Sequence, residues 1–324
     1  MRIVIAGGTG AIGRPLLPML TKAGHDVTAL TRNPQRKEWI EESGATAVIC
    51  DVRDADKVDS VVGATQPEVV IDLLTSLPQN FDPRKAAAAY RENDEIRRVG
   101  TGALVAAAEK ADVERYIVQS VAFQYAPVGP SVVDEDAPTW TDAPKPVDRS
   151  VEVLLANERK VTENDVFTGT VLRYGFLYGP GTWFETGGSY LEQIRKRQFP
   201  IVGDGAGVNS LVHVHDAALA TIAALNAGTN AAGIFNIVDD DPAPMSELIP
   251  ELARIMDYKS PRRVPKWLAS MLAGRYLAAA STQLRGASNA KAREQFGWKP
   301  TISTWRDGVV KYRDSNPSDD ADAR

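Results

Sequence analysis

The chain has 324 residues, 44% of them hydrophobic, and a formal net charge of −5. This length predicts about two domains, and the hydrophobic fraction is ample for a packed core. The acidic balance argues against a general binder of nucleic acid or of anionic membranes. No apolar run approaches the roughly 20 residues that cross a bilayer. Cys50 is the only cysteine, so no intrachain disulfide can form, and a reducing cytoplasm is the expected location.

The first 20 residues predict a strand, a glycine-rich turn and a helix. A β-branched run at 3–6 precedes GGTGAIG, and apolar residues then recur near helical spacing. In such a unit Gly7 permits unusual backbone dihedrals, Gly10 lets the backbone approach a pyrophosphate, and Gly13 lets the helix lie close to the strand. The amino terminus of the helix offers free N–H groups to phosphates. The unit therefore predicts a dinucleotide site.

Further apolar runs alternate with helical segments along the chain, at 27–30, 47–50, 69–73, 116–118, 171–174 and 234–238. Helical patterns lie at about 94–110 and 149–164. Short strands separated by helices predict an α/β fold with a Rossmann-type, doubly wound parallel sheet. The proline-rich stretch 120–147 is loop-like, and YGPGTWFETGGSY after residue 178 is typical of a loop at the mouth of a site.

With these segments in order, the chain resembles the extended short-chain dehydrogenase/reductase superfamily, in its NAD-dependent epimerase/dehydratase branch. The resemblance covers about residues 1–312 and rests on GGTGAIG, GTGALVAAAEKADVERYIVQS, LRYGFLYGPG, LVHVHDAALA, FNIVDDDP and NAKAREQFGWKP. It implies a dinucleotide-binding domain at 1–178 completed by 209–238, and a smaller, mostly helical substrate lobe at 179–208 and 239–312. The polar, acidic end of the chain, 313–324, predicts a disordered tail.

The resemblance also implies which residues hold the dinucleotide. They are Gly7, Thr9, Gly10, Ile12 and Gly13 at the pyrophosphate, Asp51 and Val52 at the adenine, Leu73, Leu74 and Thr75 near the nicotinamide ribose, and Tyr174, Gly175 and Phe176 beside the nicotinamide ring. No metal site is expected, because His213 and His215 have no set of acids or cysteines nearby. Asp216 is expected to cap the following helix.

The end of the second predicted strand favours NADP(H) over NAD(H). An NAD site usually places an acid about 20 residues beyond the glycines, where it accepts the ribose hydroxyls. No acid occurs from Val27 through Lys37, and Arg32 stands at the end of the strand. A guanidinium there can bind a 2′-phosphate that a carboxylate would repel. The alternative is that Arg32 and its basic neighbours are ordinary solvated charges.

The acid–base set usual in this family is absent. It consists of a tyrosine with a lysine four residues later on one helix face, where the ammonium lowers the pKa of the phenol, plus a serine or threonine. None of the 9 tyrosines is followed by a lysine at that spacing. Counting back from Glu158 puts Ser150 and Leu154 at the two positions. Val121 takes the place of the hydroxyl residue, with Ser120 one position earlier.

Three interpretations follow from an intact glycine turn without this set. The first is an atypical enzyme that binds NADP(H) and a small carbonyl, alcohol or sugar-type substrate. Tyr125 and Ser120 are its catalytic candidates, although each is also a plausible packing residue, and packing is the commoner role for such side chains. The second is a dinucleotide-sensing regulator or scaffold, and the third is a non-redox enzyme with a structural nucleotide. We favour the first, because loops such as WFETGGSY elaborate the substrate lobe. A homodimer is left open as the oligomeric state.

Overall fold

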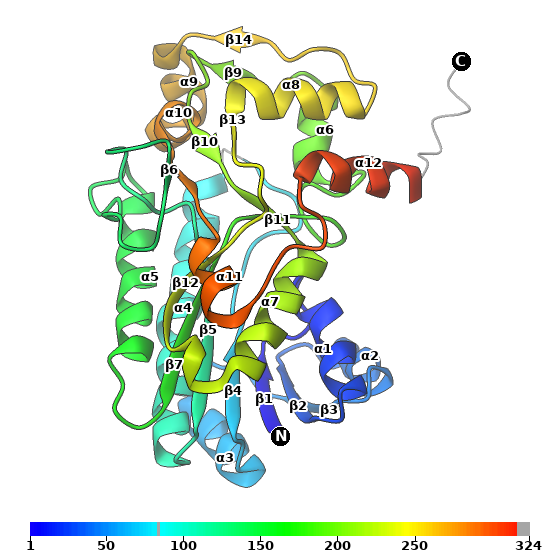
Figure 1. The fold of residues 1–324 in the computed structure, drawn as a ribbon, viewed down its shortest axis with the longest axis vertical. Helices are drawn as coiled ribbons and strands as arrows, with labels where there is room; N and C mark the ends of the chain where they lie inside the picture. Colours follow the sequence, from blue (N-terminus) through cyan, green and yellow to red (C-terminus); the bar gives the residue numbers. More distant parts are fainter. Residues whose placement is uncertain (83–84, 316–324) are drawn as a thin grey trace.

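The computed structural model describes residues 1–82 and 85–315. Its main sheet is built from β1 (Arg2–Ala6), β2 (Asp26–Thr31), β3 (Thr46–Ile49), β4 (Val69–Asp72), β5 (Arg115–Val121), β7 (Thr168–Tyr174) and β12 (Gly233–Ile237). The strand order is β12-β7-β5-β4-β1-β2-β3, and every neighbouring pair is parallel (Figure 1). Each apolar run that predicted a strand lies in this sheet, which confirms the Rossmann-type α/β fold.

Helices cover both faces of the sheet because each strand is apolar on both sides. Along β1, Ile3 and Ile5 pack into one layer, and Val4 and Ala6 pack into the other, as the alternation of side chains in a strand requires. The first layer contains α1 (Gly13–Lys22), α2 (Lys37–Glu42), α7 (Val214–Ala227) and α11 (Ala290–Phe296). The second contains α3 (Ala55–Thr65), α4 (Ala86–Lys110) and α5 (Val147–Thr162).

The remaining elements form a smaller body above the carboxyl ends of the main strands (Figure 1). They include α6 (Ser189–Arg195), α8 (Met245–Ile255), α9 (Lys266–Ala273), α10 (Arg275–Gln283) and α12 (Trp305–Ser315), with the short strands β6 (Val132–Val133), β8 (Phe176–Tyr178), β9 (Ile201–Val202), β10 (Val208–Asn209), β11 (Leu211–His213), β13 (Ala243–Pro244), β14 (Arg263–Val264) and β15 (Gly286–Ala287). Single-turn 3-10 helices lie at η1 (Pro34–Arg36) and η3 (Gly228–Ala231).

The carboxyl-terminal helix reaches further than the sequence indicated. Helix α12 continues to Ser315, past residue 312, where we expected the tail to begin. The rest of that predicted tail, 316–324, lies outside the described residues. None of the helices in 1–82 and 85–315 combines the length and the apolar character that a bilayer crossing needs.

A buried ion pair joins α5 to the sheet. Arg173 on β7 donates from Nη2 to Oε2 of Glu158 at 2.6 Å and from Nε to Oε1 at 2.9 Å. Both side chains are 4% exposed. Oε1 of Glu158 also accepts hydrogen bonds from Ser120 Oγ at 2.6 Å and from Gln124 Nε2 at 2.8 Å. The carboxylate therefore links α5 to β5 and β7 at once.

The same network continues to the edge strand β12. Nη1 of Arg173 donates to the hydroxyl of Tyr125 at 3.0 Å, and that hydroxyl donates to Oδ1 of Asn236 at 2.7 Å. The backbone N–H of Asn236 donates to Oε1 of Glu135 at 2.6 Å. Burial alone would lower the pKa of Arg173, but the hydrogen bonds and charge of Glu158 outweigh burial and raise it. The guanidinium therefore stays charged and fixed.

We predict that Arg173→Met lowers the free energy of unfolding by about 3–5 kcal/mol, because it leaves the Glu158 carboxylate buried without a counter-ion. Urea denaturation followed by circular dichroism measures the loss. Lys110→Met is the matched control, since its partner Asp59 and Lys110 itself are 43% and 68% exposed and such a pair is worth at most about 1 kcal/mol. Equal losses in the two variants would contradict the argument.

Candidate functional site

The glycine turn after β1 is shaped by close backbone contacts. Gly7 has a φ of +82°, and a Cβ there would lie 2.4 Å from the carbonyl oxygen of Leu73. A Cβ at Gly13 would lie 2.4 Å from the backbone of Gly8, so this glycine packs α1 onto the turn itself. A Cβ at Gly10 would lie 3.2 Å from the carbonyl oxygen of Gly7. The turn is thus a bare backbone cradle that side chains would fill.

Helix α1 begins directly at this cradle. Its N-cap, Ile12, provides no side-chain cap, and the first turn contains no acidic residue. The N–H groups of Arg14 and Leu16 already donate to the carbonyl oxygens of Gly10 at 3.0 Å and Ile12 at 3.2 Å, and Pro15 has no N–H. An anion at this end would therefore meet the N–H of Gly13 and the positive end of the helix dipole. Arg14 Nε donates to the carbonyl oxygen of Thr9 at 3.3 Å, which places a cation beside the turn. The cradle fits a pyrophosphate, and Arg14 is a neighbour that the motif alone did not single out.

A cluster of charges lies beyond the ends of β2 and β3. Asp51 accepts two hydrogen bonds from Arg53, from Nε to Oδ1 at 3.0 Å and from Nη2 to Oδ2 at 2.5 Å. These bonds lower the pKa of Asp51 to about 2, and the charge of the exposed Arg32 also lowers it. The Asp51 carboxylate is therefore already paired. Arg53 was missed because its role depends on a contact with Asp51.

The residues predicted at the adenine and at the nicotinamide ribose meet on helix α4. A Cβ at Gly100 would lie 2.7 Å from Cδ1 of Leu74 and 2.8 Å from Cγ2 of Val52. Gln119 Nε2 donates to the carbonyl oxygen of Leu74 at 3.2 Å. Leu73 and Leu74 are buried, whereas Thr75 is exposed. Helix α4 and strand β5 therefore hold the loop after β4, and Thr75 lies at its exposed surface.

After β7, Tyr174, Gly175 and Phe176 have different surroundings. The hydroxyl of Tyr174 hydrogen bonds Thr221 of α7 at 2.7 Å, so this side chain belongs to the layer under the sheet. The ring of Phe176 stacks on Phe123, with centroids 4.1 Å apart and planes inclined by 10°. Both phenylalanines are half-buried. The end of β7 thus presents a flat aromatic pair, in which Phe123 was not predicted.

The loop YGPGTWFETGGSY lies over the glycine turn. A Cβ at Gly181 would lie 3.9 Å from Cα of Ala11. Trp183 Nε1 donates to the carbonyl oxygen of Pro78 at 2.9 Å, and its ring lies 5.0 Å from the ring of Phe81. These contacts join the loop to the segment after β4, so that two loops enclose the space above the turn.

Both catalytic candidates belong to the buried network. Ser120 is 3% exposed and Tyr125 is 0% exposed, and the Glu158–Arg173 pair connects their hydroxyls. Burial raises the pKa of Tyr125 to about 12, against the opposing charge of Arg173. A phenol with that pKa can donate a hydrogen bond near neutral pH but does not act as a base. Their catalytic role stays a prediction.

The positions of the absent tyrosine and lysine face helix α4. Ser150 Oγ donates to Oδ2 of Asp94 at 3.0 Å, while Leu154 is buried. Asp94 is 3% exposed, and burial raises its pKa despite the bond from Ser150. Nothing in the helical pattern of 94–110 distinguished Asp94 from a surface acid.

The histidine segment caps helix α7 and anchors the segment before α12. His213 accepts a hydrogen bond from the N–H of His215 at 3.2 Å and is the cap of α7. The expectation that Asp216 caps this helix was wrong. Its carboxylate instead accepts from the N–H groups of Thr301 at 2.9 Å and Ile302 at 3.0 Å, which anchors the segment before α12. Within the described ranges no group of three His, Cys, Asp or Glu could hold a metal ion.

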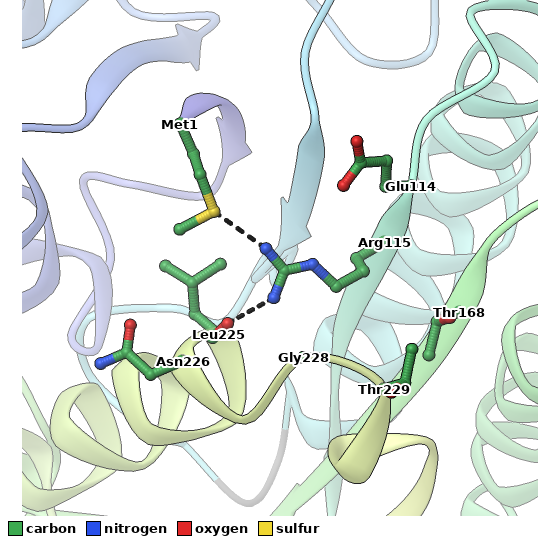
Figure 2. A pocket seen from close by; sticks show the side chains of 8 residues that line it. All are labelled: Met1, Glu114, Arg115, Thr168, Leu225, Asn226, Gly228 and Thr229. Atoms are coloured by element: carbon green, nitrogen blue, oxygen red, sulfur yellow. Dashed lines mark hydrogen bonds between the residues drawn. The ribbon is translucent and has the colours of Figure 1, made fainter.

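A cavity of about 450 Å³ lies at the amino ends of β1, β5 and β7, and Figure 2 shows the residues that line it. Arg115 and Thr168, the first residues of β5 and β7, line it together with Met1. Arg115 donates to the carbonyl oxygen of Leu225 and to the sulfur of Met1. Because the cofactor residues gather at the carboxyl ends of the strands, this cavity is separate from them.

Comparison with known proteins places this geometry in a family. Residues 3–237 match the NAD dependent epimerase/dehydratase family. The chain is 41% identical over 311 residues to 3-diazoavenalumate denitrifying reductase from Streptomyces sp, which covers 95% of this chain and 99% of that protein. It is 24% identical over 333 residues to 2-alkyl-3-oxoalkanoate reductase from Stenotrophomonas maltophilia (strain K279a), with 94% and 96% covered.

Solved structures agree on the fold. UDP-glucose 4-epimerase from Thermotoga maritima, determined with UDP-glucose, superposes with a TM-score of 0.75 at 20% identity and covers 98% of this chain and 100% of that one. dTDP-glucose 4,6-dehydratase from Streptomyces venezuelae, with NAD bound, gives a TM-score of 0.74 at 19% identity and covers 98% of each chain. From the glycine turn, the strand order and the family match together, the chain belongs to the NAD dependent epimerase/dehydratase family.

Proposed function

We propose that this protein is an NADPH-dependent reductase of a small substrate and that it works without the tyrosine–lysine pair. The observation that carries the proposal is an intact phosphate cradle in a chain whose two acid–base positions hold Ser150 and Leu154. When bound, the dinucleotide supplies hydride. The chain itself has to hold both reactants, exclude water and meet whatever need for protons the substrate has.

The charges beyond β2 support NADPH over NADH. Arg32 is exposed at the end of the strand, and the nearby Asp51 carboxylate is paired with Arg53. A 2′-phosphate would therefore meet the Arg32 guanidinium, and the pairing of Asp51 with Arg53 reduces the repulsion from that carboxylate. A 2′-hydroxyl would find Asp51 already engaged by Arg53.

The substrate class follows from the missing acid and from the relative at 41% identity, whose name describes the reductive removal of nitrogen from a diazo carboxylate. A diazonium group takes hydride at its terminal nitrogen: R–N≡N⁺ and hydride give R–N=N–H. Loss of N₂ then leaves that hydrogen on carbon as R–H, so the sum needs no proton from the protein. Reduction of a carbonyl, in contrast, needs a proton on oxygen. We propose a carboxylate that carries a cationic diazonium group as the substrate, because a neutral diazo compound would need a proton as well as hydride.

The side chains above the strand ends suit a flat substrate. Phe123 and Phe176 stack with their planes nearly parallel, and Tyr90 and Tyr276 are half-buried around the same apolar cluster. Aromatic walls bury flat apolar groups and keep water away from a reactive intermediate. A carbonyl substrate would need a proton donor and an alcohol or sugar-type substrate a base. Burial raises the pKa of Tyr90 and Tyr276, so neither phenol suits these roles near neutral pH.

We expect Gly10→Val to abolish dinucleotide binding while the fold persists, because its branched side chain fills the space above the Gly7 carbonyl where a pyrophosphate would lie. Calorimetric titration with NADPH measures binding. Gly63→Val on α3 is the control, since a Cβ there meets nothing within 4 Å. Wild-type affinity in a folded Gly10→Val protein would show that the nucleotide binds elsewhere.

Arg32→Glu should reverse or remove the preference for NADPH over NADH, since the new carboxylate repels a 2′-phosphate and accepts a ribose hydroxyl. The ratio of the two dissociation constants, measured by quenching of protein fluorescence, reports the change. Arg159→Glu, exposed on α5, alters the net charge equally and should leave the ratio unchanged. Equal binding of NADH and NADPH by the wild type would refute the argument.

Turnover of the proposed diazonium carboxylate should consume NADPH and release N₂ in equal amounts. Because the reaction requires no proton from the protein, Tyr125→Phe and Ser120→Ala should each keep kcat within about threefold of the wild-type value. Absorbance of NADPH and mass-spectrometric detection of N₂ measure the two quantities. A fall of about 10²-fold or more in kcat, with unchanged unfolding, would restore these hydroxyls as acid catalysts. Tight binding of NADPH with no turnover of diazo or carbonyl compounds would instead favour a dinucleotide-sensing regulator without catalytic activity.

A further inference from the structure

A column of polar residues runs along one face of helix α4. Thr101, Arg97, Asp94 and Tyr90 are spaced by four, three and four residues, so their side chains lie on one side of the helix. Thr101, Arg97 and Asp94 are 1%, 8% and 3% exposed. Buried polar groups almost always have a hydrogen-bond partner, so we expect one for each polar side-chain atom of this column.

Two atoms of the column lack such a partner. Thr101 Oγ1 donates to Oδ2 of Asp72 at 2.6 Å, and Ser150 Oγ donates to Oδ2 of Asp94 at 3.0 Å. Oδ1 of Asp94 and Nε of Arg97 are buried and have no partner among residues 1–82 and 85–315. One is an acceptor, the other a donor, and they lie one helical turn apart. A hydroxyl group, which both donates and accepts, can satisfy the two together.

The column lies where the dinucleotide is expected to end. Since β4 and β5 are parallel, the connecting helix α4 runs in the opposite direction. Thr101 is bonded to Asp72, the last residue of β4, so the residues before Thr101 extend past the carboxyl end of the strand. Asn93 Oδ1 accepts from the backbone N–H of Ser76 at 2.8 Å, which holds the loop after β4 against this part of α4.

This loop contains Leu74, which packs against Gly100. It is the segment predicted to lie near the nicotinamide ribose. We propose that Asp94 and Arg97 bind the hydroxyls of that ribose, an assignment that rests on the proposed function. The carboxylate accepts from one hydroxyl, as an acid does at the adenine ribose of NAD sites, and the guanidinium donates to it or to its neighbour. Ser150 is a positioning residue, since it holds Asp94 through the second carboxylate oxygen.

The test compares two ligands, NADPH and 2′,5′-ADP, which carries the adenosine phosphates but has no nicotinamide ribose. Asp94→Asn and Arg97→Lys should each weaken NADPH binding about tenfold to a hundredfold, the range for a hydrogen bond to a charged group. Binding of 2′,5′-ADP should stay within about twofold of wild type. Glu95→Gln, an exposed neighbour paired with Arg98 on the same helix, is the control. Isothermal titration calorimetry measures every constant.

Folded variants that bind NADPH like the wild type would overturn the proposal and leave an internal water as the partner of Asp94 and Arg97. A parallel loss for both ligands would overturn it as well, since the effect would then come from damage to the whole site. If Asp94→Asn does not fold, Arg97→Lys and Ser150→Ala decide by the same comparison. A wild-type protein that binds neither ligand would refute the proposed function itself and, with it, this assignment.

Discussion

The buried ion pair between Glu158 and Arg173 constrains much of this structure. Two charges taken out of water are tolerable only if their remaining donors and acceptors are also satisfied. Ser120, Gln124 and Tyr125 meet that demand, which fixes the end of β5 against β7 and α5. The requirement for satisfied charges explains why the hydroxyls of Ser120 and Tyr125 have structural partners and are not free to move.

The fold could be predicted from sequence because its signals are local. Apolar runs in β-branched residues mark the strands, and GGTGAIG marks the turn, each within a few residues. The site depended partly on contacts between distant positions, such as Ser150 with Asp94, and partly on the side-chain conformation within one loop, where Arg53 holds Asp51. The first limit also explains the misplaced cap, because Thr301, a partner of Asp216, lies 85 residues further along the chain.

Short paired strands in the upper body were beyond prediction for a related reason. Two-residue strands such as β9 and β14 contain no alternation long enough to recognise, and their pairing is set by the packing of the helices around them. Helix α4 also begins earlier than the apolar pattern indicated, because the run of alanines before Tyr90 is compatible with a helix but gives no periodicity. The sequence of α4 does contain the polar column, but its role becomes visible only when α5 packs against α4 and Ser150 contacts Asp94.

A leucine at position 154 is compatible with the buried cation of Arg97. Leu154 lies on the face of α5 between Ser150, which bonds Asp94, and Asn157, whose side chain donates to the backbone carbonyl of Arg97 at 2.9 Å. Burial already lowers the pKa of Arg97 to about 10, although nearby acids oppose the shift. A lysine at Leu154 would bring a second cation into the same buried layer, where like charges repel strongly. A leucine avoids that cost, and a substrate that takes hydride without a proton removes the need for the lysine.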